Sequence, residues 1–465
     1  MRIGLRPKKG RATSKSTVMP PNAPNSAKES VVPDIEDLNY LSTSEALQVY
    51  RYRTPTTPKR GVLLSLLYYL AKTLRAIPLT FKNPGWKGLE GTSVLVGLAS
   101  RNQLSAVETV IDSLPGSRVL SMNNVVPGPR FPELQAYLCG VRHVRDLLRL
   151  RSGASEYKRI GYDHFLDRYL VTYGYHEAAL RVLEHIRPEL LLVSNDHSME
   201  PRTLASAATQ LGITTVYMQH ASVTAGFPPL AFDLAFLDGE DAARKYDQAT
   251  EWRPTVFLCG IAKADDARRS YRDRTELNRL GVCVNEVDPQ ANVEAFIADL
   301  RRARPTLEVV LRPHPRDQRT WDAARLGISV SDAKEVDSFS FLDRIDAIVT
   351  GPSNIALEAA LVGVRSAFKD FGKLAHDPYG FVKEGLCMPV DTAEDALRAL
   401  DPELTTDPIV APLRKYCATV GTSFDGRSAE LVQELILERL GGGIDMRRWR
   451  KRPDFDHIDV YELAE

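Results

Sequence analysis

The sequence predicts an α/β protein made of two Rossmann-like halves that face a central cleft. Three observations lead to this fold class. The chain has 465 residues, enough for two domains. From Gly91 onward, short β-branched runs alternate with helical stretches, which is typical of parallel βαβ units. This alternation pauses over a charged stretch at residues 262–280 and then restarts, which indicates a boundary between the halves.

The first 90 residues differ in composition from the rest. Residues 1–58 are rich in Pro, Ser, Thr and Lys and poor in apolar residues, so we expect a disordered basic arm. Residues 59–90 are expected to form an amphipathic helical segment, because leucines and tyrosines cluster between Leu63 and Leu74 with basic residues on either side. Such a helix either packs on the protein or lies on an anionic membrane surface.

Residues 91–262 are expected to form an N-terminal Rossmann-like domain. Strands are predicted at short apolar runs, and helices where apolar residues recur at three- and four-residue spacing. The predicted strands are 93–98, 118–121, 190–194, 214–218 and 234–237, and the predicted helices are 134–151 and 200–211.

Residues 263–280 are the expected linker, and residues 281–440 the expected C-terminal Rossmann-like domain. A basic C-terminal tail is expected at 441–465, where five Lys or Arg surround Trp449. In the second domain, strands are predicted at 281–285, 307–311, 328–330 and 346–349, and helices at 291–304 and 354–362.

Composition excludes several classes of protein. Lys+Arg and Asp+Glu are balanced at 60 each, so no nucleic-acid partner is expected. The five cysteines are dispersed, which favours reduced thiols over disulfides. Neither the cysteines nor the histidines have the spacing of metal ligands, so no metal site is predicted. The longest apolar stretch, at 61–71, is about half a membrane span.

The sharpest motif is Arg-Pro-His-Pro-Arg at 312–316, at the end of a predicted strand. Two prolines restrict the backbone around one histidine, and ligands of open parallel sheets bind beyond the carboxyl ends of strands. We therefore expect His314 to hydrogen-bond a departing phosphate, with Arg312 and Arg316 supplying positive charge. The alternative is a rigid turn with a surface histidine.

The second motif, Gly-Pro-Ser-Asn at 351–354, joins a predicted strand directly to a helix. Ser353 is a natural N-cap, and the free amides of a first helical turn attract anions. We expect Ser353 and Asn354 to contribute to a nucleotide phosphate site, and Glu358, one turn further on, to reach a ribose hydroxyl. The alternative is ordinary helix capping.

Two strands of the first half also end in polar residues. Asp196 and His197 follow the third predicted strand, and His220 follows the fourth. A carboxylate or an imidazole at this edge can take the proton of an acceptor hydroxyl, so Asp196 and His220 are alternative catalytic bases. The structural alternatives are a helix-capping aspartate and a buried histidine. Asp238, after the next strand, adds a further candidate carboxylate.

Together these motifs resemble those of the GT-B transferases of bacterial surface-polysaccharide assembly. That group includes sialyl- and polysialyltransferases, capsule Kdo transferases and CDP-glycerol glycerophosphotransferases. The resemblance covers roughly residues 91–440 and implies a GT-B-like fold with acceptor binding at 91–262 and nucleotide binding at 281–440. It also implies that His314 contacts the phosphate of a CMP leaving group and that Ser353 is a phosphate-binding hydroxyl.

This sequence departs from the family pattern at two points. Ala221 follows Gln-His where many relatives have Gly. No acidic pair followed by Gly supplies the base aspartate of the bacterial sialyltransferases. The assignment of Asp196 as the base therefore rests on its position at a strand end.

The resemblance implies an inverting, metal-independent glycosyltransferase of capsule or surface-polysaccharide synthesis. Its donor would be a nucleotide-activated sugar of the CMP-sialic acid or CMP-Kdo type, with no separate cofactor. Three alternatives stay open: a CDP-glycerol glycerophosphotransferase of teichoic-acid-like polymer synthesis, an isomerase like UDP-GlcNAc 2-epimerase, and a non-catalytic scaffold of a polysaccharide assembly complex.

The expected partners are a nucleotide-sugar donor, a glycan or lipid-linked acceptor, and an anionic membrane surface. The basic arm, the Leu/Tyr helix and the Trp449 segment together predict a cytoplasmic protein bound peripherally to the inner face of the cell membrane. Because that attraction is electrostatic in part, salt should weaken it.

Overall fold

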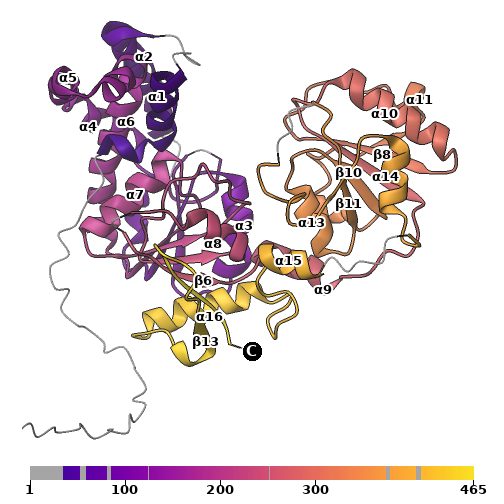
Figure 1. The fold of residues 1–465 in the computed structure, drawn as a ribbon. Coiled ribbons are helices and arrows are strands. Elements are labelled where there is room, and N and C mark those ends of the chain that lie inside the picture. The colour runs from indigo at the N-terminus through magenta and orange to yellow at the C-terminus, as the bar shows by residue number, and fades with distance from the viewer. Residues whose placement is uncertain are drawn as a thin grey trace, which may run out of the picture.

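The computed structural model describes residues 35–464, apart from 53–58, 81–84, 124, 251, 373–376 and 405–409. Two sheets of mainly parallel strands, each flanked by helices, form two Rossmann-like domains in a GT-B-like arrangement (Figure 1). This confirms the fold class that the sequence predicts.

An eight-stranded sheet forms the centre of the first domain, and the five strands predicted there all form. Every neighbouring pair is parallel except the first, which is antiparallel. In the order in which they lie side by side, the strands are β13 (Trp449–Lys451), β14 (Asp459–Leu463), β6 (Thr255–Leu258), β5 (Leu234–Leu237), β4 (Thr214–Met218), β3 (Leu190–Val193), β1 (Val94–Leu98) and β2 (Ser117–Ser121).

Helices cover both faces of this sheet, as alternating side chains show. Val96 packs with Val107 and Leu431, whereas its neighbour Leu95 belongs to a separate cluster with Leu204. Successive residues of a strand point to opposite faces, so each face has its own core. The helices concerned are α3 (Arg101–Ile111) and α16 (Ser428–Leu440) on one side, and α7 (Met199–Gln210) and α8 (Glu240–Tyr246) on the other.

Five more helices form a layer at one end of the first domain (Figure 1), which we call the helical layer. Gly174 and Gly140 bring two of its helices close together, because a Cβ at Gly174 would lie 1.9 Å from the carbonyl oxygen of Ala136. The predicted helix at 134–151 is divided here into two. The helices are α1 (Tyr40–Tyr52), α2 (Gly61–Thr80), α4 (Glu133–Val141), α5 (Val144–Gly153) and α6 (Glu156–Ile186).

The prediction of a disordered arm over 1–58 is wrong for the part that forms α1. Asn39, just before this helix, donates to Thr172 Oγ1 at 3.1 Å, and Arg168 of α6 donates to Ser42 Oγ at 3.1 Å. Ala46 is buried as well. These tertiary contacts stabilise a segment whose own composition favours disorder. Residues 1–34 and 53–58 lie outside the described residues.

The second domain has a six-stranded parallel sheet in the order β12-β11-β10-β7-β8-β9. Its strands are β7 (Arg279–Val284), β8 (Glu308–Pro313), β9 (Ser329–Val330), β10 (Ala347–Thr350), β11 (Arg365–Phe368) and β12 (Met388–Pro389). Its helices are α10 (Gln290–Ala303), α11 (Ala323–Leu326), α12 (Ser338–Leu342), α13 (Ile355–Leu361) and α14 (Ala393–Leu400).

The predicted linker at 263–280 contains helical turns at Ala262–Ala264 and α9 (Asp265–Arg269) before an extended stretch. On the return path the chain forms α15 (Val410–Tyr416), which packs against both α8 and α13. The two domains are therefore joined by two connections rather than one.

The C-terminal boundary differs from the prediction. The second domain was expected to reach residue 440, but α16 packs on α3 of the first domain. The expected free tail at 441–465 instead forms β13 and β14, and β14 extends the first sheet beside β6. Trp449 is buried, with its ring 4.7 Å from that of Phe257.

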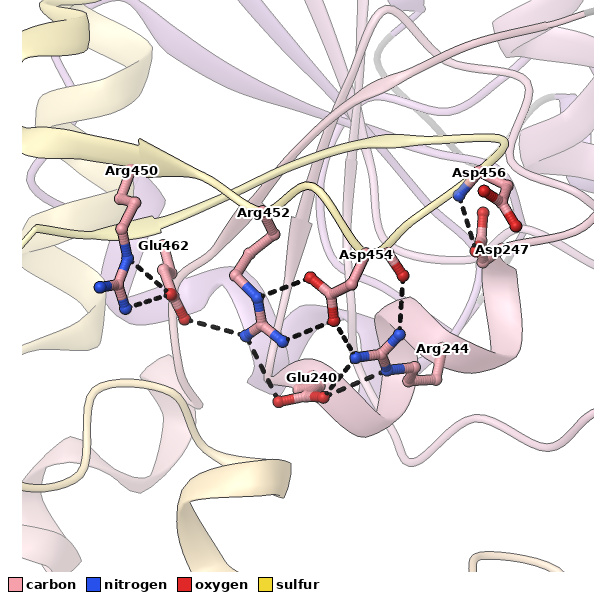
Figure 2. Close-up of polar contacts among 8 residues, drawn as sticks. All are labelled: Glu240, Arg244, Asp247, Arg450, Arg452, Asp454, Asp456 and Glu462. Carbon is pink, nitrogen blue, oxygen red and sulfur yellow. Dashed lines mark hydrogen bonds and ion pairs between the residues drawn. The ribbon is translucent and has the colours of Figure 1, made fainter.

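The basic residues of this segment are paired. Figure 2 shows a chain of ion pairs that runs across α8 and both C-terminal strands. Arg452 donates to Asp454 at 2.9 Å, to Glu462 at 3.1 Å and to Glu240 at 3.4 Å. The other pairs within 447–452 are Arg447 with Asp445, Arg448 with Glu434 and Glu438, Arg450 with Glu462, and Lys451 with Asp459.

We expect Arg452→Ala to lower the free energy of unfolding by about 1–2 kcal/mol, because a half-buried guanidinium with three carboxylate partners is lost. Arg450→Ala is the matched control: Arg450 is 71% exposed, against 20% for Arg452. The control should change stability by less than about 0.5 kcal/mol. Urea unfolding of the three proteins measures this, and equal losses would contradict the ranking by burial.

Among the helices that the structure describes, none has the length and apolar character needed to cross a membrane.

Candidate active site between the two domains

A pocket lies where the carboxyl ends of strands from both sheets approach each other. From the first domain it is lined by residues that follow β4, β5 and β6, and from the second by one face of α13. Ligands of parallel sheets bind at such strand ends. The main lining residues are Gln219, His220, Ala221, Ser222, Asp238, Ile261, Ala262, Lys263, Asn354, Leu357, Glu358 and Leu361.

An ion pair crosses this pocket. Lys263 Nζ, just after β6, lies 3.2 Å from Glu358 Oε1 of α13. Both side chains are largely shielded from solvent. The pair brings Glu358 and Asn354, both expected at the nucleotide, to the same pocket as His220. The contact between Glu358 and a ribose stays a prediction.

His220 enters the pocket with one ring nitrogen unpaired. Its Nδ1 is buried and has no hydrogen-bond partner among the described residues. Burial lowers its pKa to about 4, an effect that His197 and Lys263 reinforce and Asp196 opposes. The imidazole is therefore neutral near pH 7. Because buried polar atoms are normally hydrogen-bonded, the unpaired Nδ1 is a candidate contact for a ligand.

Asp196, the other candidate base, is fully buried and does not line the pocket. Its Oδ2 accepts a hydrogen bond of 2.6 Å from the Tyr246 hydroxyl, and its Oδ1 lies 3.0 Å from His197 Nδ1. Its main-chain oxygen accepts a hydrogen bond from Arg202. Both carboxylate oxygens are thus engaged, and Asp196 is placed to orient His197 rather than to meet a substrate directly.

The network around Asn195 defines the tautomer of His197. Asn195 Oδ1 accepts from the backbone N–H groups of His197 and Ser198, so its Nδ2 is the atom that faces His197 Nε2 at 3.3 Å. Nε2 must then be the acceptor, and the ring proton sits on Nδ1, where it is donated to Asp196. Both ring nitrogens of His197 are therefore engaged, and the lone pair on Nε2 accepts the long bond from Asn195. The ring lies 6.3 Å from that of His220.

Two buried tyrosines support this arrangement from behind. The hydroxyls of Tyr217 and Tyr246 lie 3.3 Å apart. Burial raises the pKa of each hydroxyl well above its ordinary value. Both tyrosines therefore stay protonated, and Tyr246 remains a donor to Asp196.

In the second domain, His314 lies at the carboxyl end of β8, as expected, but it does not line the pocket. Its Nδ1 accepts from the backbone N–H of Arg316 at 3.2 Å, whereas Glu286 Oε2 is 3.8 Å away, beyond hydrogen-bond range. In the neutral ring the proton is then on Nε2. Burial and Arg316 lower the pKa of His314, while Glu286 and Asp317 oppose the shift, which favours that neutral form. Arg316 is largely exposed and pairs with Glu286.

The Arg312 side chain points into the interior of the second domain. Its guanidinium is buried, donates to Ser331 Oγ at 3.1 Å and to the Val336 carbonyl at 2.8 Å, and lies over the ring of Phe341. These contacts tie β8 to the segment before α12. The geometry therefore assigns Arg312 to the packing of its own domain, whereas a role at the phosphate had been expected.

The predicted cap of α13 is displaced by one residue. The N-cap is Asn354, not Ser353, and its side chain makes no capping bond. Ser353 Oγ accepts from the Ile355 N–H only at 3.5 Å. Asn354 Oδ1 is buried without a partner in the described part of the chain. Asn285, which follows β7, donates to the Pro352 carbonyl at 3.2 Å and holds this loop in place.

Three residues of the site were missed or given another role. Lys263 was assigned to the linker, because the strand before it went unrecognised. His197 and Tyr246 received no role. Asp238, a further candidate carboxylate, lines the pocket, and burial raises the pKa of its carboxyl well above the ordinary value. Lys263, His197 and Asp238 all follow the end of a strand, and this position is the signal that could have identified them. Tyr246 has no such signal. No group of three or more His, Cys, Asp or Glu suited to a metal ion occurs within the described residues.

No family model matches the sequence, and no curated protein matches it. Solved structures do resemble the chain. A protein described as a UDP-N-acetylglucosamine 2-epimerase from Listeria monocytogenes superposes with a TM-score of 0.50 at 15% identity, over 75% of this chain and 97% of that one. At this identity the likeness shows the fold alone.

Two further structures are less similar. The UDP-GlcNAc 2-epimerase from Neisseria meningitidis, bound to UDP-GlcNAc, has a TM-score of 0.46 at 14% identity, over 74% of this chain and 99% of that one. The wall teichoic acid polymerase TagF has a TM-score of 0.41 at 10% identity, over 82% of this chain and 99% of that one.

Proposed function

We propose that the protein is an inverting glycosyltransferase that uses a nucleotide-activated sugar and reacts where its two domains face each other. One observation carries the proposal. The first domain supplies two imidazoles, that of His220 with an unpaired ring nitrogen and that of His197 with Nε2 in a long bond to Asn195, and a histidine at a strand end of the second domain presents an N–H group. Transfer of a sugar from a phosphate leaving group needs a base on one side and a hydrogen-bond donor on the other.

On the acceptor side, we assign the base to His197, with His220 as the alternative. Nε2 of His197 exchanges its long bond from Asn195 for the acceptor hydroxyl and takes the hydroxyl proton while that oxygen forms a bond to the anomeric carbon. Asp196 acts as a positioning residue, because it accepts the Nδ1–H bond that keeps the lone pair on Nε2. The imidazolium that forms is stabilised by the same carboxylate.

On the donor side, the bond between the anomeric carbon and the phosphate oxygen breaks, and negative charge grows on the departing nucleotide. The Nε2–H of His314 donates to that oxygen, and Arg316 adds positive charge beside it. Ser353 and Asn354 are further candidate contacts, because their loop lies at the carboxyl end of β10, separated from β8 only by β7. Attack from the side opposite the phosphate inverts the anomeric centre.

We favour CMP as the nucleotide and surface polysaccharide as the product, on the basis of the Arg-Pro-His-Pro motif at 312–315. A glycan or a lipid-linked glycan would be the acceptor. The mechanism assigns leaving-group stabilisation to His314 and Arg316 and therefore needs no metal ion.

A thermal-shift panel of CMP, CDP, UDP and GDP tests the donor assignment. We expect CMP to raise the melting temperature most, because a ligand at 100 times its Kd stabilises the native state by about 2.7 kcal/mol. The control is His314→Ala, which should reduce the shift given by CMP. A dominant shift with UDP would contradict the CMP assignment and favour UDP-sugar chemistry instead. No shift with any nucleotide would contradict the transferase proposal.

A further inference from the structure

The outer face of α2 carries a continuous apolar stripe. Leu63, Leu67, Leu70, Leu74 and Ile77 follow one another at spacings of four and three residues, so they share one side of the helix. Their side chains are between 40% and 75% exposed. Soluble proteins rarely leave a row of this length uncovered, and such rows mark interaction surfaces.

The opposite side of α2 is fixed to the protein. Ser65, Tyr69 and Ala76 are buried, and the Tyr69 hydroxyl donates to the Tyr137 carbonyl of α4 at 2.5 Å. Lys72 pairs with the fully buried Asp167 of α6 at 2.8 Å. These contacts prevent the helix from turning its stripe inward.

The apolar surface continues onto the neighbouring helices. Leu138 and Val141 of α4 and Leu150 of α5 are also about half exposed. α4 packs directly against α2. Figure 1 shows these helices grouped at the end of the first domain that is remote from the second domain. The surface therefore lies apart from the candidate active site.

Cations border this surface. Three exposed arginines lie in a row, one just before α5 and two within it: Arg142, Arg145 and Arg149. Arg142 pairs with Glu177, and Arg149 lies only within 3.9 Å of Asp146. In the sequence, residues 1–30, which precede α1 of the same layer, hold seven Lys or Arg and one Glu. Apolar side chains bordered by Arg are the pattern of helices that lie in the headgroup region of a membrane.

We propose that the helical layer docks on an anionic lipid bilayer, with the α2 stripe in the acyl boundary and the α5 arginines at the headgroups. The positive charge beside the stripe distinguishes a lipid surface from a second copy of this chain as its partner. A second copy of this chain would set the same arginines against each other, whereas an anionic leaflet complements them. This inference goes beyond the proposed function and does not depend on it.

Co-sedimentation of the full chain with vesicles tests the proposal. Vesicles of phosphatidylcholine with phosphatidylglycerol are compared with phosphatidylcholine alone, at low and high salt. We expect the protein to pellet with the anionic vesicles at low salt and to be released in part by high salt. Protein that remains in the supernatant with both vesicles would overturn the proposal.

Variants assign the binding face. The double variant Leu67→Glu/Leu70→Glu should lower the vesicle-bound fraction at least about tenfold, because two charges enter the acyl boundary. Leu437→Glu, on the exposed side of α16, is the matched control and should bind as the wild type does. Equal binding by the double variant and the control would overturn the assignment to α2.

A second pair of measurements separates the alternatives. Arg145→Gln/Arg149→Gln leaves the apolar stripe intact and should weaken binding to anionic vesicles while leaving the melting temperature unchanged. Light scattering in the absence of lipid should give the same mass, that of a monomer, for the wild type and for the Leu67→Glu/Leu70→Glu variant. A wild-type dimer that this variant converts to a monomer would show that a second copy covers the face, and would overturn the lipid proposal.

Discussion

We expect the His197→Gln variant to turn over about 10²–10⁴-fold more slowly than the wild type while its affinity for CMP stays nearly unchanged. The reason is that Asp196 keeps the ring proton of His197 on Nδ1, so that Nε2 can exchange its long bond from Asn195 for the acceptor hydroxyl and take its proton. A glutamine amide nitrogen carries no basic lone pair. Turnover is measured with the donor that the nucleotide panel selects, and CMP affinity by the thermal shift.

Two comparisons make this prediction sharp. Asp196→Asn should also lower turnover, because an amide cannot accept from both His197 and Tyr246 as the carboxylate does. His143→Gln, in the helical layer, is the matched control and should change neither turnover nor CMP affinity. If His197→Gln keeps its activity while Asp196→Asn or His220→Gln loses it, the base is the residue whose variant is inactive.

The second large effect is expected at His314. His314→Ala should lower turnover by about 10²–10³-fold, because one hydrogen bond to the departing phosphate is lost. The fold should survive, since the side chain is partly exposed and its Nδ1 contact is with the neighbouring Arg316 backbone. Turnover and the melting temperature without ligand are measured together.

The conservative variant His314→Gln distinguishes a hydrogen-bond donor from a turn-forming residue. A glutamine side-chain amide can present an N–H group near the position of Nε2, so it should recover part of the activity lost in His314→Ala. Activity near wild type in His314→Ala would contradict the phosphate role. A large fall in melting temperature that accompanies the loss would assign His314 to the turn instead.

The central strands of the fold could be predicted because each is a short apolar run buried on both faces. Strand β6 carries the same signal, because Thr255–Leu258 is a four-residue apolar run like that of β5, but it was missed beside the charged stretch that follows it. Lys263 was consequently placed in a linker instead of at a strand end. The C-terminal strands were missed for another reason, since Arg450 and Arg452 look like a solvated tail until their carboxylate partners are known.

In the candidate site, too, some features could be predicted from the sequence and others could not. Position at a strand end brought Asp196, His197, His220 and His314 to attention, because parallel topology makes that edge common to all strands. Which of them faces a ligand depends on side chains far away in the sequence. Tyr246 is 50 residues from Asp196 and occupies one of its oxygens, and Ser331 and Val336 draw Arg312 into the interior.

The pairing of β14 with β6 has a consequence for how the chain is made. All residues of the second domain lie between these two strands, so during synthesis its sheet emerges whole from the ribosome before the first sheet has its last members. The first domain cannot complete its fold until α16, β13 and β14 have left the exit tunnel. Until then, the edge of β6 and the surface of α3 stay uncovered. The second domain is therefore able to fold first, and the residues from 428 onward decide when the first domain is complete.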